Sequence, residues 1–267
     1  MCAWQGPRRH ARVRRDSLWP DCRGPSRRSD TCSNLEPGRV ADTLALGARC
    51  VRRDRSTGRG RRDRRRARAR LGTVIAFVLA GLVGYACGCI PFANLVARRH
   101  GVEDLRSVGD RNPGYWNARQ RLGIRSALPV LVLDGAKGVA GAAAGLMIAG
   151  LWGGVIGWTA AIVGHMFPVT MRFRGGRGIL CFAGGALVIV PLAVAVALVA
   201  LVIVRWRWDF ARGIQAAMIT APFATWIIYG AGIELFAIVA LLVLISARSG
   251  LADLALKRAG IDKHQPD

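Results

Sequence analysis

Residues 138–171 read GVAGAAAGLMIAGLWGGVIGWTAAIVGHMFPVTM, and this stretch decides the fold class. It runs for 34 residues without an Asp, Glu, Lys or Arg. A bilayer core takes about 20 apolar residues of helix, and charge within it is costly. The stretch is therefore too long for one membrane span. The glycines of residues 150–154 predict a turn that divides it into two spans.

Four further uncharged runs extend this pattern along the chain. They cover residues 71–97, 178–204, 213–233 and 235–247. Pro191 lies near the middle of the run at 178–204, where its missing backbone N–H favours a helix break. With two shorter helices around Pro191, we expect an all-α, polytopic bundle of about seven transmembrane helices in residues 71–267. Such a protein would be a multi-pass protein of the cell membrane.

Residues 1–70 differ in composition from the rest of the chain. They hold 21 Arg, no Lys and 7 acidic residues, a net charge of +14, whereas residues 71–267 carry +9. A segment so charged, without apolar periodicity, buries too little surface to offset chain entropy, so we expect a disordered basic extension. We also expect it to be a start-site artefact of a GC-rich genome, with the protein beginning near Leu71–Val74. The alternative is that the arginines of residues 59–70 bind phosphate-rich polymers or anionic lipid.

Arginines in the connecting segments predict the orientation in the membrane. Residues 98–125 contain seven Arg and residues 172–177 contain three, and two predicted spans separate these loops. Short loops rich in Lys and Arg stay on the cytoplasmic side. Both loops are therefore expected to face the cytoplasm. The break at Pro191 would bring the basic segment Arg205–Arg212 to the same side.

The first basic loop reads GDRNPGYWNARQR at residues 109–121. Its Asn-Pro-Gly sequence at residues 112–114 favours a tight turn, because Pro fixes one dihedral angle and Gly accepts a positive one. Two amide side chains and two guanidinium groups could bind an anion here, those of Asn112, Asn117, Arg119 and Arg121. The alternative is an ordinary solvated loop of the positive-inside kind.

The second basic loop reads RFRGGRG at residues 172–178. Its glycines, Gly175, Gly176 and Gly178, let the backbone approach a ligand, and free amides at the start of the next helix favour an anion. Arg174 and Arg177 can hold phosphate oxygens with paired hydrogen bonds. We expect this loop to face the first loop across the same membrane surface.

Two ionisable groups and one histidine lie within apolar sequence. Asp134 and Lys137 are three residues apart, so they share a helix face and can pair. Ionisable residues at membrane depth indicate function, and the alternative here is a structural ion pair. His165 lies in an apolar run, and a lone histidine of this kind is more often structural than catalytic. The seven cysteines are irregularly spaced and form no metal-binding or disulfide pattern.

Together, and in this order, the motifs resemble those of the bacterial acyl-phosphate:glycerol-3-phosphate acyltransferases. They are GCIPFANLVAR at 88–98, DLR at 104–106, NPG at 112–114 with Asn117, DGAKG at 134–138, GHMFP at 164–168 and GGRG at 175–178. The resemblance implies a seven-helix membrane enzyme that acylates glycerol 3-phosphate with acyl phosphate and forms lysophosphatidic acid. It implies no cofactor, metal or coenzyme A. The partners would be these two substrates and membrane lipid, without a specific nucleic acid.

The resemblance also implies roles for individual residues. The catalytic set would be Asn112, Asn117, Arg119, Arg121, Lys137 and His165. The phosphate-binding set would be Gly114, Arg174, Gly175, Gly176, Arg177 and Gly178. A basic, glycine-lined mouth would concentrate both phosphorylated substrates, while the acyl tail lies between helices. A glycerol hydroxyl would then attack the acyl carbonyl and inorganic phosphate would leave.

The sequence departs from the family pattern at several positions. Asp110 and Arg111 replace a Ser and a Gly of the first loop, and Gln120 replaces an Arg. Further replacements follow the glycine loop and occupy the last helix, at Leu180, Cys181, Ser246, Ala247 and Gly250. Asp110 would place negative charge where a phosphate is expected.

These departures leave other functions open. One alternative is an acyltransferase for another acceptor. A second is a non-catalytic paralogue that retains an anionic lipid or phosphate site. A small transporter fits less well, because the polar motifs cluster in loops on one face rather than at the membrane midplane.

Overall fold

The computed structural model describes residues 37–102 and 104–260, with side chains described from residue 60 onward. The regular elements in these ranges are helices, and no strand occurs among them. In chain order they are α1 (Pro37–Gly88), α2 (Phe92–Arg99), α3 (Tyr115–Met166), the 3-10 turn η1 (Val169–Met171), α4 (Ile179–Ile189), α5 (Pro191–Arg207), α6 (Phe210–Tyr229) and α7 (Ile233–Arg258). The all-α prediction is confirmed for this part of the chain.

Helix α1 begins well before the predicted membrane span. Residues 37–70 are helical, where the sequence led us to expect disorder. Ala, Leu and Arg have high helix propensity, and a helix already formed in the apolar half extends into such residues at little cost. The chain divides into two compact units, Met1–Arg61 and Arg62–Asp267, and both basic loops belong to the second. The disorder expected for residues 1–36 concerns positions outside the described ranges.

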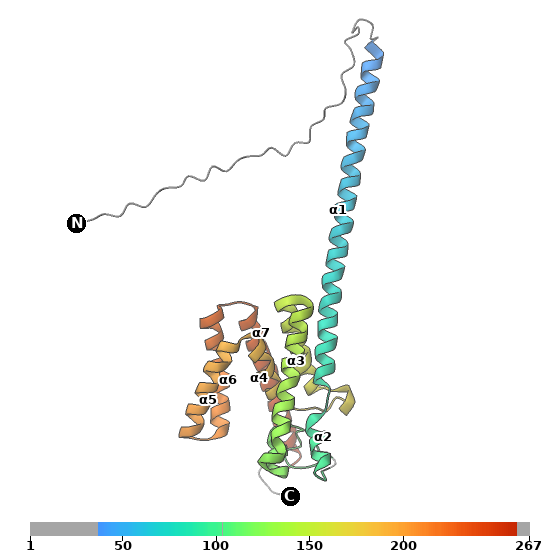
Figure 1. Cartoon of the computed structure of the whole chain (residues 1–267). Coiled ribbons are helices and arrows are strands. Elements are labelled where there is room, and N and C mark those ends of the chain that lie inside the picture. The colour runs from blue at the N-terminus through green and yellow to red at the C-terminus, as the bar shows by residue number, and fades with distance from the viewer. Residues whose placement is uncertain (1–36, 103, 261–267) are drawn as a thin grey trace, which may run out of the picture. The chain divides into compact units, whose positions relative to one another are not determined.

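The long α3 consists of two helices joined by a reversal. Ala149 and Gly150 leave the helical region, with φ of −146° and +63°, at the turn predicted from the glycines of residues 150–154. The two halves pack so closely that the backbone carbonyl of Gly153 occupies the space that a side chain at Gly145 would need. Helix α3 therefore runs along the molecule and back again (Figure 1).

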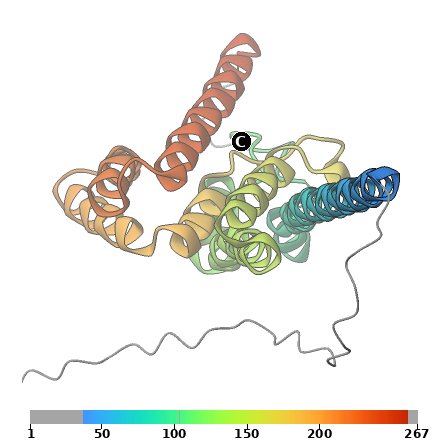
Figure 2. The same cartoon turned by 90° about the horizontal axis from the view of Figure 1, so that it is seen from above.

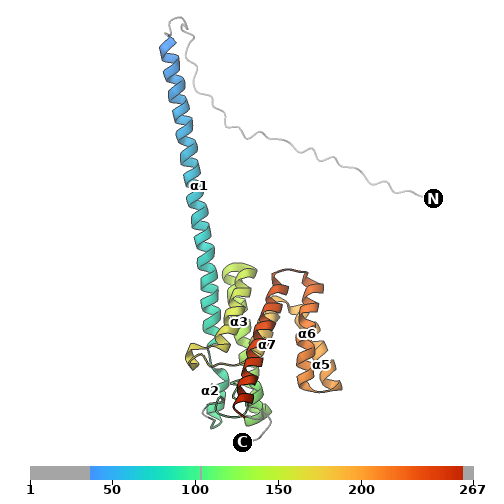
Figure 3. The ribbon, with the colours of Figure 1, turned by 180° about the vertical axis from the view of Figure 1, so that it is seen from behind.

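The predicted break at Pro191 is confirmed. Helix α4 ends at Ile189, and α5 begins at Pro191, a helix position where the absent N–H costs nothing. The turn between α5 and α6 lies at the end of the molecule that carries α2 and the start of α3 (Figures 1 and 3). The basic segment Arg205–Arg212 is therefore at the same end as the two basic loops.

Within the described residues, three stretches are long and apolar enough to cross a membrane. They are Gly60–Arg99, Tyr115–Met171, which contains the α3 reversal, and Ile233–Arg258. Helices α4 and α5 are shorter, with 11 and 17 residues, and the count of seven passes stays a prediction. Seen along the helices, the α3 halves and α4 lie between residues 71–88 of α1 and the α5–α6 pair (Figure 2).

Candidate active site

The segment that leads from α2 into the first basic loop is held by a polar network, which begins on α2. Asn94 Nδ2 donates to Asp104 Oδ1 at 2.9 Å, and Arg106 Nη2 lies 2.5 Å from Asp104 Oδ2. Burial alone would raise the pKa of Asp104, but hydrogen bonds from Arg106 and Asn94 outweigh burial and lower this pKa to about 2. Arg106 Nη1 also donates to the backbone carbonyl of Met171 at 2.9 Å. The network thus ties the first loop to the segment before the glycine loop.

Asn117 is fully buried at the start of α3 and shapes the first loop from within. Its Nδ2 lies within hydrogen-bonding distance of three loop carbonyls, those of Leu105 at 2.8 Å, Val108 at 3.0 Å and Asn112 at 3.2 Å. Buried carbonyl groups need such partners, since leaving one unpaired costs free energy. The side-chain amide of Asn117 therefore stabilises the folded backbone of the loop.

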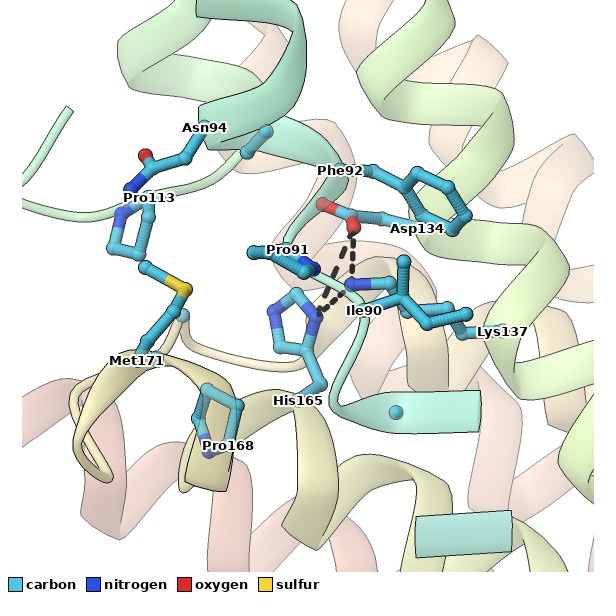
Figure 4. A pocket seen from close by; sticks show the side chains of 14 residues that line it. Ile90, Pro91, Phe92, Asn94, Pro113, Asp134, Lys137, His165, Pro168 and Met171 are labelled. Carbon is cyan, nitrogen blue, oxygen red and sulfur yellow. Dashed lines mark hydrogen bonds and ion pairs between the residues drawn. The ribbon is translucent and has the colours of Figure 1, made fainter. Parts of the chain in front are cut away.

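Asp134, Lys137 and His165 form a buried cluster that joins the two halves of α3 (Figure 4). Lys137 Nζ lies 2.8 Å from Asp134 Oδ1, the ion pair expected from their spacing. His165 Nδ1 lies 3.4 Å from Lys137 Nζ and 3.9 Å from Asp134 Oδ1. Charges so buried are tolerated because they are paired. The cluster borders a small space of about 10 Å³, the size of one water molecule.

The glycine loop folds back onto the end of α3. The N–H of Gly175 donates to the carbonyl of Met166 at 3.0 Å, and the N–H of Gly176 donates to that of His165 at 3.1 Å. A side chain at Gly176 would collide with the His165 imidazole. Gly178 has φ of +86° and immediately precedes α4. The backbone amides of Gly175 and Gly176, which were predicted to bind an anion, therefore donate to carbonyls of α3 instead. The first backbone amides of α4 have no acceptor within their own helix.

Arg177 links both loops to α7. Its Nη2 lies 3.0 Å from Asp253 Oδ1 and 3.6 Å from Asp110 Oδ2. Asp110 is buried and accepts a hydrogen bond from the backbone N–H of Asn112 at 3.1 Å. The negative charge of Asp110 is therefore balanced by Arg177 and by a backbone donor.

Two cavities meet at Asn112 and Arg177, which line both. The first, here named the loop cavity, has a volume of about 350 Å³ and lies between the two loops and α7. It is lined by Arg106, Asp110, Arg111, Asn112, Pro113, Arg174, Gly175, Arg177, Arg248, Ala252, Ala255, Leu256 and Ala259. Five of these residues are arginines and one is an aspartate, so the lining is strongly positive.

The second, here named the helix cavity, has a volume of about 130 Å³ and lies between α3, α4 and α6. It is lined by Asn112, Gly114, Tyr115, Trp116, Leu131, Asp134, His165, Arg177, Gly178, Ile179, Leu180, Phe210 and Ile214. Its lining combines polar groups with apolar and aromatic side chains. This mixture suits a ligand with a charged head and an apolar tail.

Most of the residues predicted to form the site line one of these three spaces, but Asn117, Arg119 and Arg121 do not. Arg119 instead lies over the Trp116 ring at 5.6 Å, and Trp116 stacks on Phe210 of α6 at 6.0 Å. The predicted catalytic roles of these three residues therefore find no support in the geometry. Sequence spacing could not show which face of the helix would point to the cavity.

The charged residues of the site that were not predicted include Asp104, Arg106, Arg248 and Asp253. The first two belong to the DLR motif at residues 104–106, which could have indicated them. Arg248 and Asp253 contact residues 73 and 76 positions away, and no local pattern reports such contacts. Among the residues that the structure describes, no group of three His, Cys, Asp or Glu side chains is placed to hold a metal ion.

Comparisons with known proteins agree with this architecture. The family model described as glycerol-3-phosphate acyltransferase matches residues 78–257. A glycerol-3-phosphate acyltransferase of Sinorhizobium fredii is 36% identical over 186 residues, which cover 67% of this chain and 89% of that protein. A glycerol-3-phosphate acyltransferase of Rhodopseudomonas palustris is 33% identical over 177 residues, which cover 62% of this chain and 86% of that protein.

A solved structure is also similar. The crystal structure of PlsY, an integral membrane glycerol 3-phosphate acyltransferase in its glycerol 3-phosphate form, superposes with a TM-score of 0.61 and 25% identity. The superposition covers 72% of this chain and 96% of that one. The prediction of a helical membrane acyltransferase is thereby confirmed. The family model spans well over half of this chain, so the chain belongs to the glycerol-3-phosphate acyltransferase family.

Proposed function

We propose that this protein transfers a fatty acyl group from acyl phosphate to glycerol 3-phosphate, at the end of the bundle where the two basic loops meet. The products are lysophosphatidic acid and inorganic phosphate. Family membership and the names of the relatives support glycerol 3-phosphate as acceptor and a membrane setting. The acyl phosphate donor and the cytoplasmic orientation are the finer parts of the proposal.

The junction of the two cavities is the observation that carries this proposal. Asn112 and Arg177 line both the arginine-rich loop cavity and the partly apolar helix cavity. A small, doubly charged acceptor suits the first cavity, and an acyl donor with a charged head and an apolar tail suits the second. Reactants bound in this way would meet at Asn112 and Arg177. Holding two reactants in contact is itself a large part of catalysis.

The reaction needs no covalent intermediate on the protein. A hydroxyl oxygen of glycerol 3-phosphate forms the new ester bond with the acyl carbon, and the bond between that carbon and the donor's phosphate oxygen breaks. The departing phosphate takes the hydroxyl proton. Arg177 and the amides at the start of α4 would stabilise phosphate charge as it develops. His165, which lines the helix cavity, would donate a hydrogen bond to the donor's head, and Asp134 pairs with Lys137 beside it.

The substitution at Asp110 is compatible with activity. Its carboxylate is buried and lies 3.6 Å from the Arg177 guanidinium. The pair also places Arg177 between the two loops, where both cavities reach it. The geometry thus supports a working enzyme with rearranged ligands over a non-catalytic paralogue.

The direct test is a transfer assay on the full chain in detergent or nanodiscs. Wild-type protein should convert acyl phosphate and labelled glycerol 3-phosphate into lysophosphatidic acid, whereas acyl-coenzyme A of the same chain length should give none. Arg177→Ala should abolish measurable phosphate-substrate binding. Absence of product above a boiled control would refute the function, and equal use of acyl-coenzyme A would refute the donor assignment.

Orientation has a separate test. In a background without native cysteines, Gln120→Cys and Ala231→Cys each introduce a single thiol at an exposed residue. The first lies in the opening turns of α3 and the second in the turn between α6 and α7, and these elements are at opposite ends of the second compact unit (Figure 1). A membrane-impermeant maleimide added to intact cells should label Cys at position 231 and spare position 120. The reverse pattern would place the two basic loops outside.

A further inference from the structure

Helix α7 brings one arginine to the glycine loop with its hydrogen-bonding capacity largely unused. Arg248 Nη2 lies 3.5 Å from the carbonyl of Gly175, at the outer limit of a hydrogen bond. Its guanidinium carbon lies 5.6 Å from the centre of the Phe167 ring. Arg248 Nε is buried and has no hydrogen-bond partner. A guanidinium has five N–H donors, and a buried donor without a partner costs free energy.

The surroundings of Arg248 favour an anion. The side chain is half-buried and lines the loop cavity together with four other arginines and Asp110. Arg106 is already bound to Asp104, and Arg177 is bound to Asp253 and lies near Asp110. Arg248 has no carboxylate partner among the ion pairs of the described residues. It is therefore the half-buried cation of this cavity that is best placed to bind a ligand.

The neighbours of Arg248 on α7 point elsewhere. Ser246, Ala247 and Gly250 are exposed, and the lining of the loop cavity does not include them. Arg248 is the residue of this segment that does line it. This segment of α7 therefore presents the Arg248 guanidinium to the glycine loop.

We propose that Arg248 is a substrate-binding residue that holds the phosphate group of the acceptor, a small phosphate monoester, in the loop cavity. This rests on the proposed function. The acyl donor carries the same phosphate chemistry, but the apolar lining needed for its tail belongs to the helix cavity, which Arg248 does not line. Arg248 therefore contributes to acceptor recognition and leaves donor binding unaffected.

The test compares Arg248→Gln and Arg248→Lys with Arg258→Gln in the full-length protein. Arg258 is a matched control, because it is an exposed arginine on the same helix and outside the cavity. Loss of a charge-assisted hydrogen bond should raise the KM for glycerol 3-phosphate roughly tenfold or more in Arg248→Gln. The KM for acyl phosphate, the kcat and the thermal unfolding temperature should stay near wild type. Arg248→Lys should recover part of the loss, and Arg258→Gln should match wild type.

Three results would overturn the proposal. One is a KM for glycerol 3-phosphate in Arg248→Gln equal to that of Arg258→Gln. Another is a rise confined to the KM for acyl phosphate, which would assign Arg248 to the donor. The third is a fall in unfolding temperature together with an equal rise in KM for both substrates, which would indicate that Arg248 has a structural role. If wild type makes no product, the proposed function fails, and calorimetric titration of glycerol 3-phosphate into wild type and Arg248→Gln still decides whether Arg248 binds it.

Discussion

The interface between α3 and α4 and the hairpin of α5 and α6 are both apolar in sequence, yet they are built in opposite ways. At the first, Asp134 and Lys137 are buried and paired, and glycines bring the helix backbones together. At the second, large apolar side chains point outward, with Trp206 91% and Ile227 77% exposed. In a bilayer, small residues allow close helix contact, buried ionic groups mark function, and large apolar groups face lipid. The comparison separates the part of the molecule that holds the proposed active site from the part whose apolar side chains face outward.

The largest effect is expected from breaking the buried ion pair. Lys137→Met leaves the Asp134 carboxylate unpaired, which should destabilise the fold by about 3–5 kcal/mol. It should also lower kcat/KM by about 100-fold through displacement of neighbouring groups. Equilibrium unfolding in mixed micelles and the transfer assay measure the two effects.

A double variant sharpens this prediction. Asp134→Leu combined with Lys137→Met removes both charges, so stability should recover while activity stays low, because an apolar pair of similar volume is often as stable as a buried ion pair. A fully active double variant would show that the cluster is structural only.

A smaller effect is expected from filling the close contact between α3 and α4. A side chain at Gly138 would collide with the backbone carbonyl of Cys181, so Gly138→Leu should cost about 3 kcal/mol in unfolding free energy. Gly250→Leu on α7 is the matched control, since no atom lies near its Cβ position. Equal stability of the two variants would show that the α3–α4 contact is looser than described.

The loop network should respond to acid through the carboxylate of Asp104. Asp104 has its pKa lowered from 3.8 to about 2. Its stabilisation is therefore complete above pH 4 and is lost as the pH falls through 2. Asp104→Asn should cost about 2 kcal/mol at neutral pH and progressively less below pH 4. Thermal unfolding of both proteins between pH 5 and pH 2.5 checks this, and a gap that does not narrow would contradict it.

The smallest effect is expected on the lipid-facing hairpin. Ile203 on α5 is 59% exposed, whereas Ile238 on α7 is fully buried. Ile203→Val should change the unfolding free energy by less than about 0.5 kcal/mol, and the chemically identical Ile238→Val should cost about 1 kcal/mol. The same unfolding titration compares them. Similar losses would mean that α5 packs against protein along this face.

Several local features of the fold could be predicted from the sequence because their causes are local. The reversal at Gly150 follows from a glycine that accepts positive φ, and the break before Pro191 follows from a missing N–H. The pairing of Asp134 with Lys137 follows from helical spacing. The helical state of residues 37–70 was not predicted. The prediction of disorder rested on their high charge and gave too little weight to the helix propensity of Ala and Arg.

The candidate site was predicted less completely. Asn117 was recognised as a donor, but its acceptors are loop carbonyls that only the folded loop brings within reach. Arg119 and Arg121 carry suitable charge yet line neither the loop cavity nor the helix cavity. Arg248 and Asp253 gave no signal in the sequence, although they contact the glycine loop.

By itself, the sequence determined that this chain is a helical membrane protein, where its helices break, and which motifs place it in its family. These properties depend on the length of uncharged runs, on backbone dihedral limits and on residue order, all of which can be read along the chain. The tertiary structure decided that Arg177 would lie between Asp110 and Asp253, and that Arg248 would face the glycine loop. Such contacts join residues far apart in the chain, so they depend on how the helices pack and which face each one presents.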